Sequence, residues 1–370
     1  MKAHGRVAIA HDYLTQRGGA ERVVLTLMKA FPEAPVHTTL YDPDGTYPEF
    51  ASADVRTSPL NRIGPLRRDH RLALPLLAPA SSRLRIDADV VVASSSGWAH
   101  GFDTEARTVV YCHNPARWLY QTDEYLGGTA WRSPIGPPLM ALRPFLKKWD
   151  RSRADKVDVY LANSRVVQQR IRSTYGRDAE LLPPPHGMDA GAPREQLPEL
   201  ADWEPGYALV VSRLLPYKNV DAVIEAVRGT DRRLVVVGRG PEEARLRATL
   251  PDNVRLLGGL SDAQLRAVYA DAGVLVAASH EDFGLTPLEA AAFAVPVVAL
   301  RGGGFLETVL EGETGVFFDS PEPDQIATGL AISDKQDWDA ARLLARAEEF
   351  GEARFIDRIR TIALEEGTGV

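Results

Sequence analysis

The chain has 370 residues, of which 45% are hydrophobic and 25% charged, with a formal net charge of −7. This composition is ordinary for a globular protein. Because the chain has more residues than one hydrophobic core usually organises, we expect two domains of roughly 150–200 residues each. No apolar run approaches the roughly 18–20 residues that span a bilayer, and the apolar stretch near the N-terminus is too short for a signal peptide. Cys112 is the single cysteine, which excludes an internal disulfide and favours a cytoplasmic location.

Short apolar runs alternate with segments of helical periodicity, which predicts βαβ units and parallel sheets. In the first half we expect an amphipathic helix at 20–31 and a second helix that ends at Tyr175. Buried strands are expected at 6–10, 89–93, 107–111 and 157–162.

The charge is unevenly distributed, with +6 on residues 1–187 and −13 on the remainder. Much of the positive charge lies in 62–85, where arginines alternate with Leu, Ile and Pro. This pattern fits a solvated surface helix and loop; the alternative is a patch for peripheral contact with an anionic membrane at its inner face. No aromatic interleaving or nucleic-acid module is present, so we exclude a nucleic-acid partner.

A boundary follows, because the stretch 181–204 is rich in Pro and Gly and lacks periodicity. We expect a first domain at 1–187, a linker at 188–204 and a second domain at 205–350. The remaining segment, 351–370, is expected to be a helix that crosses back to the first domain. Strands of the second domain are expected at 207–212, 234–237, 254–257, 274–277 and 297–300, with a helix at 261–272. The predicted fold class is α/β, with two doubly wound domains that bind ligands at the carboxyl ends of their strands.

The clearest chemical signal is the segment that follows the strand at 274–277, HEDFGLTPLEAAAFAVPVVALRGGGFLETV. Its residues 283–286 must turn the chain from strand to helix, with Thr286 as the N-cap and Pro287 in the first turn. Free backbone N–H groups would then lie at the carboxyl end of a buried strand, where anions bind readily. The alternative is a capping box, in which Glu289 only closes the helix start. Glu281, in turn, is either a ligand contact or an exposed loop carboxylate.

A second signal is VVSRLLPYKNV at 210–220, in which Arg213 and Lys218 follow the end of a strand. Two cations on one strand-to-helix connection suit a diphosphate, because Arg offers a planar fork and Lys a point charge. The alternative is surface charge at a domain edge.

Together these segments resemble the retaining glycosyltransferases of family 4, which have the GT-B fold of two Rossmann-like domains facing a central cleft. Glu281 and Glu289 match the family's Glu-x7-Glu motif, and 212–214 with Lys218 match its Ser-Arg-Leu-x-x-x-Lys motif. Segments 111–120 and 11–38, with a glycine loop, look most like those of bacterial mannosyltransferases that build polysaccharides and glycolipids. The resemblance also covers 149–171, 234–247, 253–279 and 302–309.

The resemblance implies specific roles for these residues. Arg213 and Lys218 would neutralise the donor diphosphate, and His113 would contact a hydroxyl of the sugar. Glu281 would bind sugar hydroxyls and Glu289 the ribose hydroxyls. The implied catalytic set is His113, Arg213, Lys218 and Glu281. The implied donor-binding set is Gly18, Gly19, Arg213, Lys218, Glu281, Phe283, Gly284, Leu285, Thr286 and Glu289.

The reaction so implied is retaining transfer of a hexose, with mannose from GDP-mannose as first choice, to an acceptor hydroxyl on a lipid-linked glycan or polysaccharide precursor. No cofactor and no metal are expected. UDP-glucose, UDP-GlcNAc, GDP-fucose and dTDP-rhamnose are alternative donors. An epimerase or hydrolase of the same fold, or a non-catalytic sugar-nucleotide-binding protein, would be a different class of function.

Four smaller features of the sequence also bear on fold and function. Gly238-Arg239-Gly240 lacks the third glycine of a dinucleotide-binding loop, which argues against a dehydrogenase. The Asp-x-Asp pairs at 42–44 and 87–89 are expected to serve turns and caps rather than a metal. The family usually has a glycine where this chain has Ala294 or Val295, and Arg301 is a further cation that could face the cleft.

Overall fold

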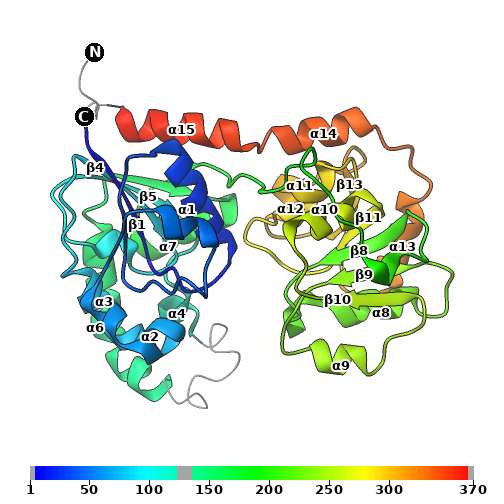
Figure 1. Cartoon of the computed structure of the whole chain (residues 1–370), viewed down its shortest axis with the longest axis horizontal. Helices are drawn as coiled ribbons and strands as arrows, with labels where there is room; N and C mark the ends of the chain where they lie inside the picture. The colour runs from blue at the N-terminus through cyan, green and yellow to red at the C-terminus, as the bar shows by residue number, and fades with distance from the viewer. Residues whose placement is uncertain (1–4, 123–135, 366–370) are drawn as a thin grey trace. The chain divides into compact units, whose positions relative to one another are not determined.

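The computed structural model describes residues 5–122 and 136–365 and divides the chain into two compact units (Figure 1). Unit 1 comprises Met1–Pro184 with Ala353–Val370, and unit 2 comprises Pro185–Glu352. The segment expected as a linker, 188–204, lies within unit 2, where Met188, Leu197 and Leu200 are buried in one of its cores.

Unit 1 is built on a seven-stranded sheet in the order β3-β2-β1-β4-β5-β6-β7, in which every neighbouring pair is parallel. Its strands are β1 (Val7–His11), β2 (Val36–Thr38), β3 (Val55–Thr57), β4 (Val90–Ser95), β5 (Arg107–Cys112), β6 (Val159–Ala162) and β7 (Glu180–Leu181). Its α-helices are α1 (Gly19–Ala30), α2 (Gly64–Arg68), α3 (Leu74–Ser81), α4 (Arg117–Tyr120), α6 (Gly136–Ala154), α7 (Arg165–Tyr175) and α15 (Glu352–Leu364). Short 3-10 turns are η1 (Pro48–Ser52), η2 (Pro59–Arg62), η3 (His70–Ala73) and η4 (Ala99–Gly101).

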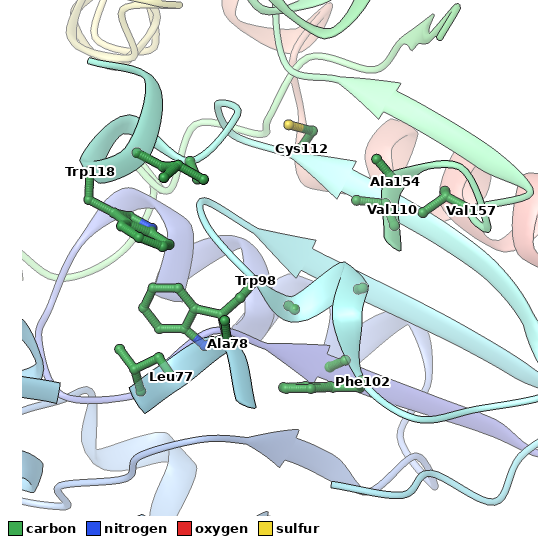
Figure 2. Close-up of a cluster of buried hydrophobic side chains, with 14 of the residues drawn as sticks. Leu77, Ala78, Trp98, Phe102, Val110, Cys112, Trp118, Ala154 and Val157 are labelled. Carbon is green, nitrogen blue, oxygen red and sulfur yellow. The ribbon is translucent and has the colours of Figure 1, made fainter. Parts of the chain in front are cut away.

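Alternate strand residues of unit 1 enter two separate cores, as the period of two along a strand requires. Ala8 and Ala10 of β1 face the core formed with α3, α6 and α7. Figure 2 shows part of this core, where Trp98 and Trp118 lie near one another from different segments. Ile9 faces the opposite core, which α1 and α15 cover.

The last helix, α15, packs on unit 1 in the same core as α1 (Figure 1). Phe355 and Ile359 are buried there. Arg107 Nη1 donates hydrogen bonds to the carbonyls of Ile362 and Ala363 at 2.8 and 3.0 Å, which satisfies acceptors that a helix C-terminus leaves open. The helix expected within 351–370 is α15, which begins at Glu352.

Unit 2 contains a six-stranded parallel sheet in the order β10-β9-β8-β11-β12-β13. Its strands are β8 (Tyr207–Val211), β9 (Leu234–Val237), β10 (Val254–Leu257), β11 (Ala272–Ala277), β12 (Val297–Leu300) and β13 (Gly315–Phe318). Its helices are η6 (Pro198–Leu200), η7 (Pro216–Lys218), α8 (Val220–Val227), α9 (Glu243–Arg247), α10 (Asp262–Ala270), α11 (Thr286–Ala291), α12 (Phe305–Thr308), α13 (Pro323–Ser333) and α14 (Ala340–Glu348). Val210 faces the core with α8 and α13, and Leu209 faces the core with α10, α11 and α12.

Each unit is thus doubly wound, and the predicted α/β class is confirmed. In each sheet the first and fourth strands of the unit are neighbours, β1 with β4 and β8 with β11. The chain leaves these two strands toward opposite sides of the sheet, so their carboxyl ends form the switch point where ligands of such sheets bind.

The position at which the family usually has glycine is explained by the backbone after α11. Ala294 adopts a left-handed conformation with φ of 57°. For a residue with a Cβ this conformation costs roughly 1–2 kcal/mol, whereas glycine adopts it freely. Ala294, rather than Val295, therefore occupies the position that favours glycine.

Within the described ranges 5–122 and 136–365, none of the helices has the length and apolar character needed to cross a membrane.

Candidate active site

The switch point of unit 2 brings together the two segments that carry the strongest sequence signals. β8 and β11 are hydrogen-bonded neighbours and run parallel. The chain beyond β8 carries Arg213 and Lys218, and the chain beyond β11 carries Glu281. Residues far apart in sequence therefore meet at one edge of the sheet.

Lys218 and Glu281 form an ion pair at this edge. Lys218 lies at the end of η7, and its ammonium group contacts Glu281 Oε1. Ser279 donates a hydrogen bond to the same oxygen at 2.6 Å. The side chains are 10% and 27% exposed, so both charges are partly removed from solvent. Asn219, in a left-handed conformation, fixes the start of α8 by donating to the Ala278 carbonyl at 2.7 Å.

Arg213 is a second cation on the same connection. Its side chain is exposed and has no hydrogen bond or ion pair to the residues that the structure describes. Its loop lies directly against the loop after β9, because a Cβ on Gly238 or Gly240 would overlap the backbone of Ser212 or Leu214. The glycines at 238 and 240 therefore allow two backbones to meet at the sheet edge.

The loop from 280 to 284 rests on the glycines at 302–304. Gly304 N donates to the Glu281 carbonyl at 2.8 Å, and a Cβ on Gly304 would overlap the backbone of Phe283. Gly284 has φ of +84°, which supplies the turn between β11 and α11. The Phe283 side chain is buried and lies 5.8 Å from the Phe350 ring, centroid to centroid. Backbone contacts with Gly303 and Gly304 therefore support this loop.

The start of α11 differs from the predicted one. Leu285 precedes α11 as its N-cap residue and makes no side-chain capping bond, so the prediction of Thr286 as the N-cap is wrong. The capping-box alternative is also absent, because Thr286 is the first residue of the helix. Glu289 Oε2 instead accepts a hydrogen bond from Tyr269 Oη at 2.8 Å.

Tyr269 is a site residue that the sequence did not reveal. It is fully buried on α10, and burial, together with the charge of Glu289, raises its pKa well above 10. The phenol therefore stays protonated and holds Glu289 in one orientation. In sequence Tyr269 is only one more apolar position of an amphipathic helix, so no signal marked it. Ser279 was likewise missed, although its place two residues before Glu281 was a usable hint.

His113 lies at the corresponding edge of unit 1, directly after β5. Its Nε2 is 2.8 Å from Ser94 Oγ, and Asn163 Nδ2 donates to its carbonyl at 3.1 Å. Burial, with a smaller contribution from the charge of His11, lowers the pKa of His113 to about 3. The imidazole is therefore neutral at physiological pH.

Gly18 and Gly19 begin α1 at the same edge of unit 1, with Gly18 as the N-cap and Gly19 as the first helical residue. A Cβ on Gly18 would lie 2.6 Å from Glu21 Oε2. The glycine therefore has a packing reason as well as the predicted ligand role. Asp12, the residue after β1, is a structural carboxylate: it accepts from the backbone N of Trp98 at 2.8 Å and of Ala99 at 2.7 Å.

Arg301 and the Asp-x-Asp pairs have local partners. Arg301 makes a bidentate contact with Glu311, at 2.7 and 2.8 Å, and also contacts Asp319, which together raise its pKa. Asp89 Oδ2 accepts from the Arg6 backbone N at 2.6 Å and Asp87 pairs with the Arg6 guanidinium, so the pair at 87–89 makes contacts to a segment distant in sequence rather than a turn or cap. In the described part of the chain, no group of three or more His, Cys, Asp or Glu is arranged to hold a metal ion.

Comparison with known families divides the chain in the same way as the structure does. The family described as "Glycosyltransferase Family 4" matches residues 17–189, and that described as "Glycosyl transferases group 1" matches residues 195–348. The two matches together span most of the chain, one on each unit.

Several relatives are mannosyltransferases. The GDP-mannose-dependent alpha-(1-6)-phosphatidylinositol monomannoside mannosyltransferase of Mycobacterium tuberculosis is 30% identical over 216 residues, which are 52% of this chain and 56% of that protein. A GDP-mannose-dependent alpha-mannosyltransferase of Mycolicibacterium smegmatis is 38% identical over 182 residues, 46% of this chain and 47% of that protein. The chain spans about half the length of the curated relatives it matches.

Solved structures share the whole architecture at low identity. HepE of Anabaena, in complex with UDP-glucose, matches with a TM-score of 0.68 and 18% identity over 97% of this chain and 99% of its own. Sucrose-phosphate synthase of Thermosynechococcus elongatus matches with a TM-score of 0.68 and 16% identity over 96% and 98%. These likenesses show the fold. With the two family matches, they confirm the predicted resemblance: the chain belongs to glycosyltransferase family 4 and has the GT-B fold.

Proposed function

We propose that this protein is a retaining glycosyltransferase that moves mannose from GDP-mannose to an acceptor hydroxyl. The observation that carries the proposal is the Lys218–Glu281 ion pair at the switch point of unit 2, with the exposed Arg213 on the same connection as Lys218. Two cations suit a diphosphate, and a partly buried carboxylate suits sugar hydroxyls. The names of the relatives from Mycobacterium tuberculosis and Mycolicibacterium smegmatis favour GDP-mannose as the donor.

In this proposal the donor diphosphate is the leaving group, and its departure concentrates negative charge on a phosphate oxygen. Arg213 and Lys218 stabilise that charge, together with backbone N–H groups of Phe283–Thr286. Preorganised electrostatic stabilisation of this kind is usually the largest contribution to catalysis. Glu281 accepts hydrogen bonds from the sugar, and Glu289, oriented by Tyr269, accepts them from the ribose.

The stereochemistry proposed is retention at the anomeric carbon. The bond from that carbon to the phosphate oxygen breaks, the acceptor oxygen bonds to the same face, and the departing phosphate oxygen takes the acceptor's proton. Among the site residues no side chain is placed as a nucleophile, so the double displacement of retaining glycosidases is not proposed. No metal or cofactor enters the scheme. On unit 1, Gly18 and Gly19 are assigned to the phosphate and His113 to a sugar hydroxyl.

Calorimetry with the full chain tests the donor site. We expect GDP-mannose to bind, with the same affinity with and without EDTA, in preference to UDP-glucose, UDP-GlcNAc and dTDP-rhamnose. Glu289→Ala should weaken binding by roughly 10- to 100-fold, because a hydrogen-bonded charged group contributes about 1.5–3 kcal/mol. Tyr269→Phe should weaken it by a few fold, since Glu289 keeps its charge but loses its fixed orientation.

Glu225→Ala is the matched control, because Glu225 pairs with Arg228 on the surface of the same unit. It should leave binding unchanged. A donor site that requires a divalent metal, or that accepts none of these sugar nucleotides, would contradict the proposal.

The acceptor is proposed to be lipid-linked, and unit 1 carries a surface that fits an anionic membrane. Exposed apolar side chains of η2 to α3 include Leu72 and Leu76, at 49% and 47% exposure. α3 packs against α6, on which Leu142 and Phe145 are 39% and 73% exposed. The exposed arginines of the segment 62–85 are Arg62, Arg68, Arg71, Arg83 and Arg85.

Vesicle flotation tests this surface. The protein should float with vesicles that contain anionic phospholipid and not with purely zwitterionic ones. Arg68→Glu with Arg71→Glu should lower the partition coefficient at least about tenfold, because each basic residue near such a surface contributes about 1 kcal/mol. Leu76→Ser should also lower it, whereas Ile332→Ser, at a similarly exposed apolar position of unit 2, should not. Equal flotation of the double variant and the wild type would exclude this surface.

A further inference from the structure

Three neighbouring strands of unit 1 place a row of polar side chains at the carboxyl edge of the sheet. His11 ends β1 and is in register with Ser94 of β4, and His113 follows β5, the next strand along. The His11 ring contacts Ser94, and Ser94 contacts the His113 ring. Glu21, in the first turn of α1, faces the other side of His11.

The positions of the protons in this row follow from the partners. His11 Nδ1 is 2.9 Å from the Ser94 carbonyl oxygen, which can only accept, so Nδ1 carries a hydrogen. Ser94 Oγ lies 3.2 Å from the same nitrogen and therefore accepts from it. The hydroxyl hydrogen is left to donate to His113 Nε2, at 2.8 Å.

His113 consequently accepts at Nε2 and, as a neutral ring, carries its hydrogen on Nδ1. The low pKa of His113, caused by burial and by the charge of His11, means that Nε2 is not protonated as well. Nδ1–H has no hydrogen-bond partner among the residues that the structure describes. It is the atom available to a ligand.

The far end of the row is a buried contact between His11 and Glu21 of α1. His11 Nε2 lies 3.9 Å from Glu21 Oε1, with the two side chains 2% and 1% exposed. Burial opposes the charged ring, but Glu21, Asp12 and the Ser94 backbone together raise the pKa of His11. The groups that face this ring are thus Glu21 from α1, Asp12 from its own segment, Ser94 from β4 and, through Ser94, His113.

We infer that Ser94, whose hydroxyl oxygen accepts from His11 Nδ1, is a positioning residue that fixes His113 as the Nδ1–H tautomer, so that His113 donates its hydrogen bond to the sugar and does not accept one. The inference rests on the proposed function for the identity of the ligand. The tautomer itself is a property of the protein without ligand, so it can be tested separately.

NMR of the full chain labelled with 15N-histidine provides that test, since ring nitrogens with and without a hydrogen have well-separated shifts. His113→Gln and His11→Gln assign the two rings. We expect His113 to be protonated at Nδ1 alone and His11 at both nitrogens. In Ser94→Ala, His113 should change to the Nε2–H form that an isolated imidazole favours, and kcat/KM should fall about tenfold with little change in KM.

Ser95→Ala is the matched control, because the Ser95 hydroxyl donates to Asp12 and not to His113. It should leave the tautomer unchanged, and Ser94→Thr, which keeps a hydroxyl, should restore it. A native His113 protonated at Nε2, or an Nδ1–H form that survives in Ser94→Ala, would overturn the inference. If the tautomer follows the prediction but His113→Ala transfers sugar normally, the role of His113 in the proposed function is wrong. The inference that Ser94 sets the tautomer of His113 is then still supported.

Discussion

Replacing Lys218 with alanine is expected to lower kcat/KM for sugar transfer by about 100- to 1,000-fold, the usual effect of removing one group that stabilises transition-state charge. The variant loses a cation at the proposed diphosphate site. It also leaves the Glu281 carboxylate, 27% exposed, without its ion-pair partner next to the incoming phosphates. The measurement is steady-state transfer from GDP-mannose, with kcat and KM determined separately.

Lys335→Ala is the control for this experiment, because Lys335 is an exposed lysine of the same unit at the end of α13. It should transfer sugar at the wild-type rate. Lys218→Arg keeps the charge but not the compact geometry, and we expect an intermediate loss. Near-normal turnover by Lys218→Ala would remove Lys218 from the mechanism.

The ion pair also predicts how two substitutions combine. Glu281→Gln removes the charge that Lys218 neutralises in the protein without donor, so its effect should not add to that of Lys218→Ala. Groups in direct contact typically show interaction energies of about 0.5–3 kcal/mol in a double-mutant cycle. Additive losses would mean that the two residues act independently on the donor. Thermal unfolding of each variant separates loss of folding from loss of catalysis.

Much of the second unit could be predicted because its strands are short, β-branched and bounded by polar residues. The strands at 234–237, 254–257 and 297–300 have the bounds expected from the sequence. β2 and β13 were not predicted: β2 has three residues, and both lack a long apolar run. Their place in the sheets depends on pairing with β1 and β12, which no local pattern reveals.

At the site, motif spacing predicted which residues gather but not how they are held. The switch-point topology explains why Lys218 and Glu281 meet. The role of Tyr269 could not be predicted, because its hydroxyl reaches Glu289 only when α10 packs beside α11. The N-cap role of Thr286 was mispredicted because a Thr-Pro pair is an equally good first turn, and the tertiary structure begins α11 there.

Gly304→Ala is expected to be the most damaging single-methyl substitution in the proposed donor site. A Cβ at this position would overlap the Phe283 backbone, which cannot yield as a flexible side chain can. The loop would have to move away, and the hydrogen bond from Gly304 N to the Glu281 carbonyl would be lost. Overpacking of this kind typically costs about 1–3 kcal/mol, and the displacement would fall on Glu281, so donor affinity should drop at least about tenfold.

Gly191→Ala provides the comparison, because a Cβ there meets only Asp189 Oδ1 at 3.4 Å, an ordinary contact in the same unit. Its donor affinity, measured by calorimetry, should match the wild type. The two variants differ from the wild type by the same methyl group, so the difference between them isolates the support that Gly304 gives to the loop. If Gly304→Ala bound the donor as tightly as Gly191→Ala, the loop at 280–284 would not depend on the close contact with Gly304. The position of Glu281 would then have to be set by Lys218 and Ser279 alone.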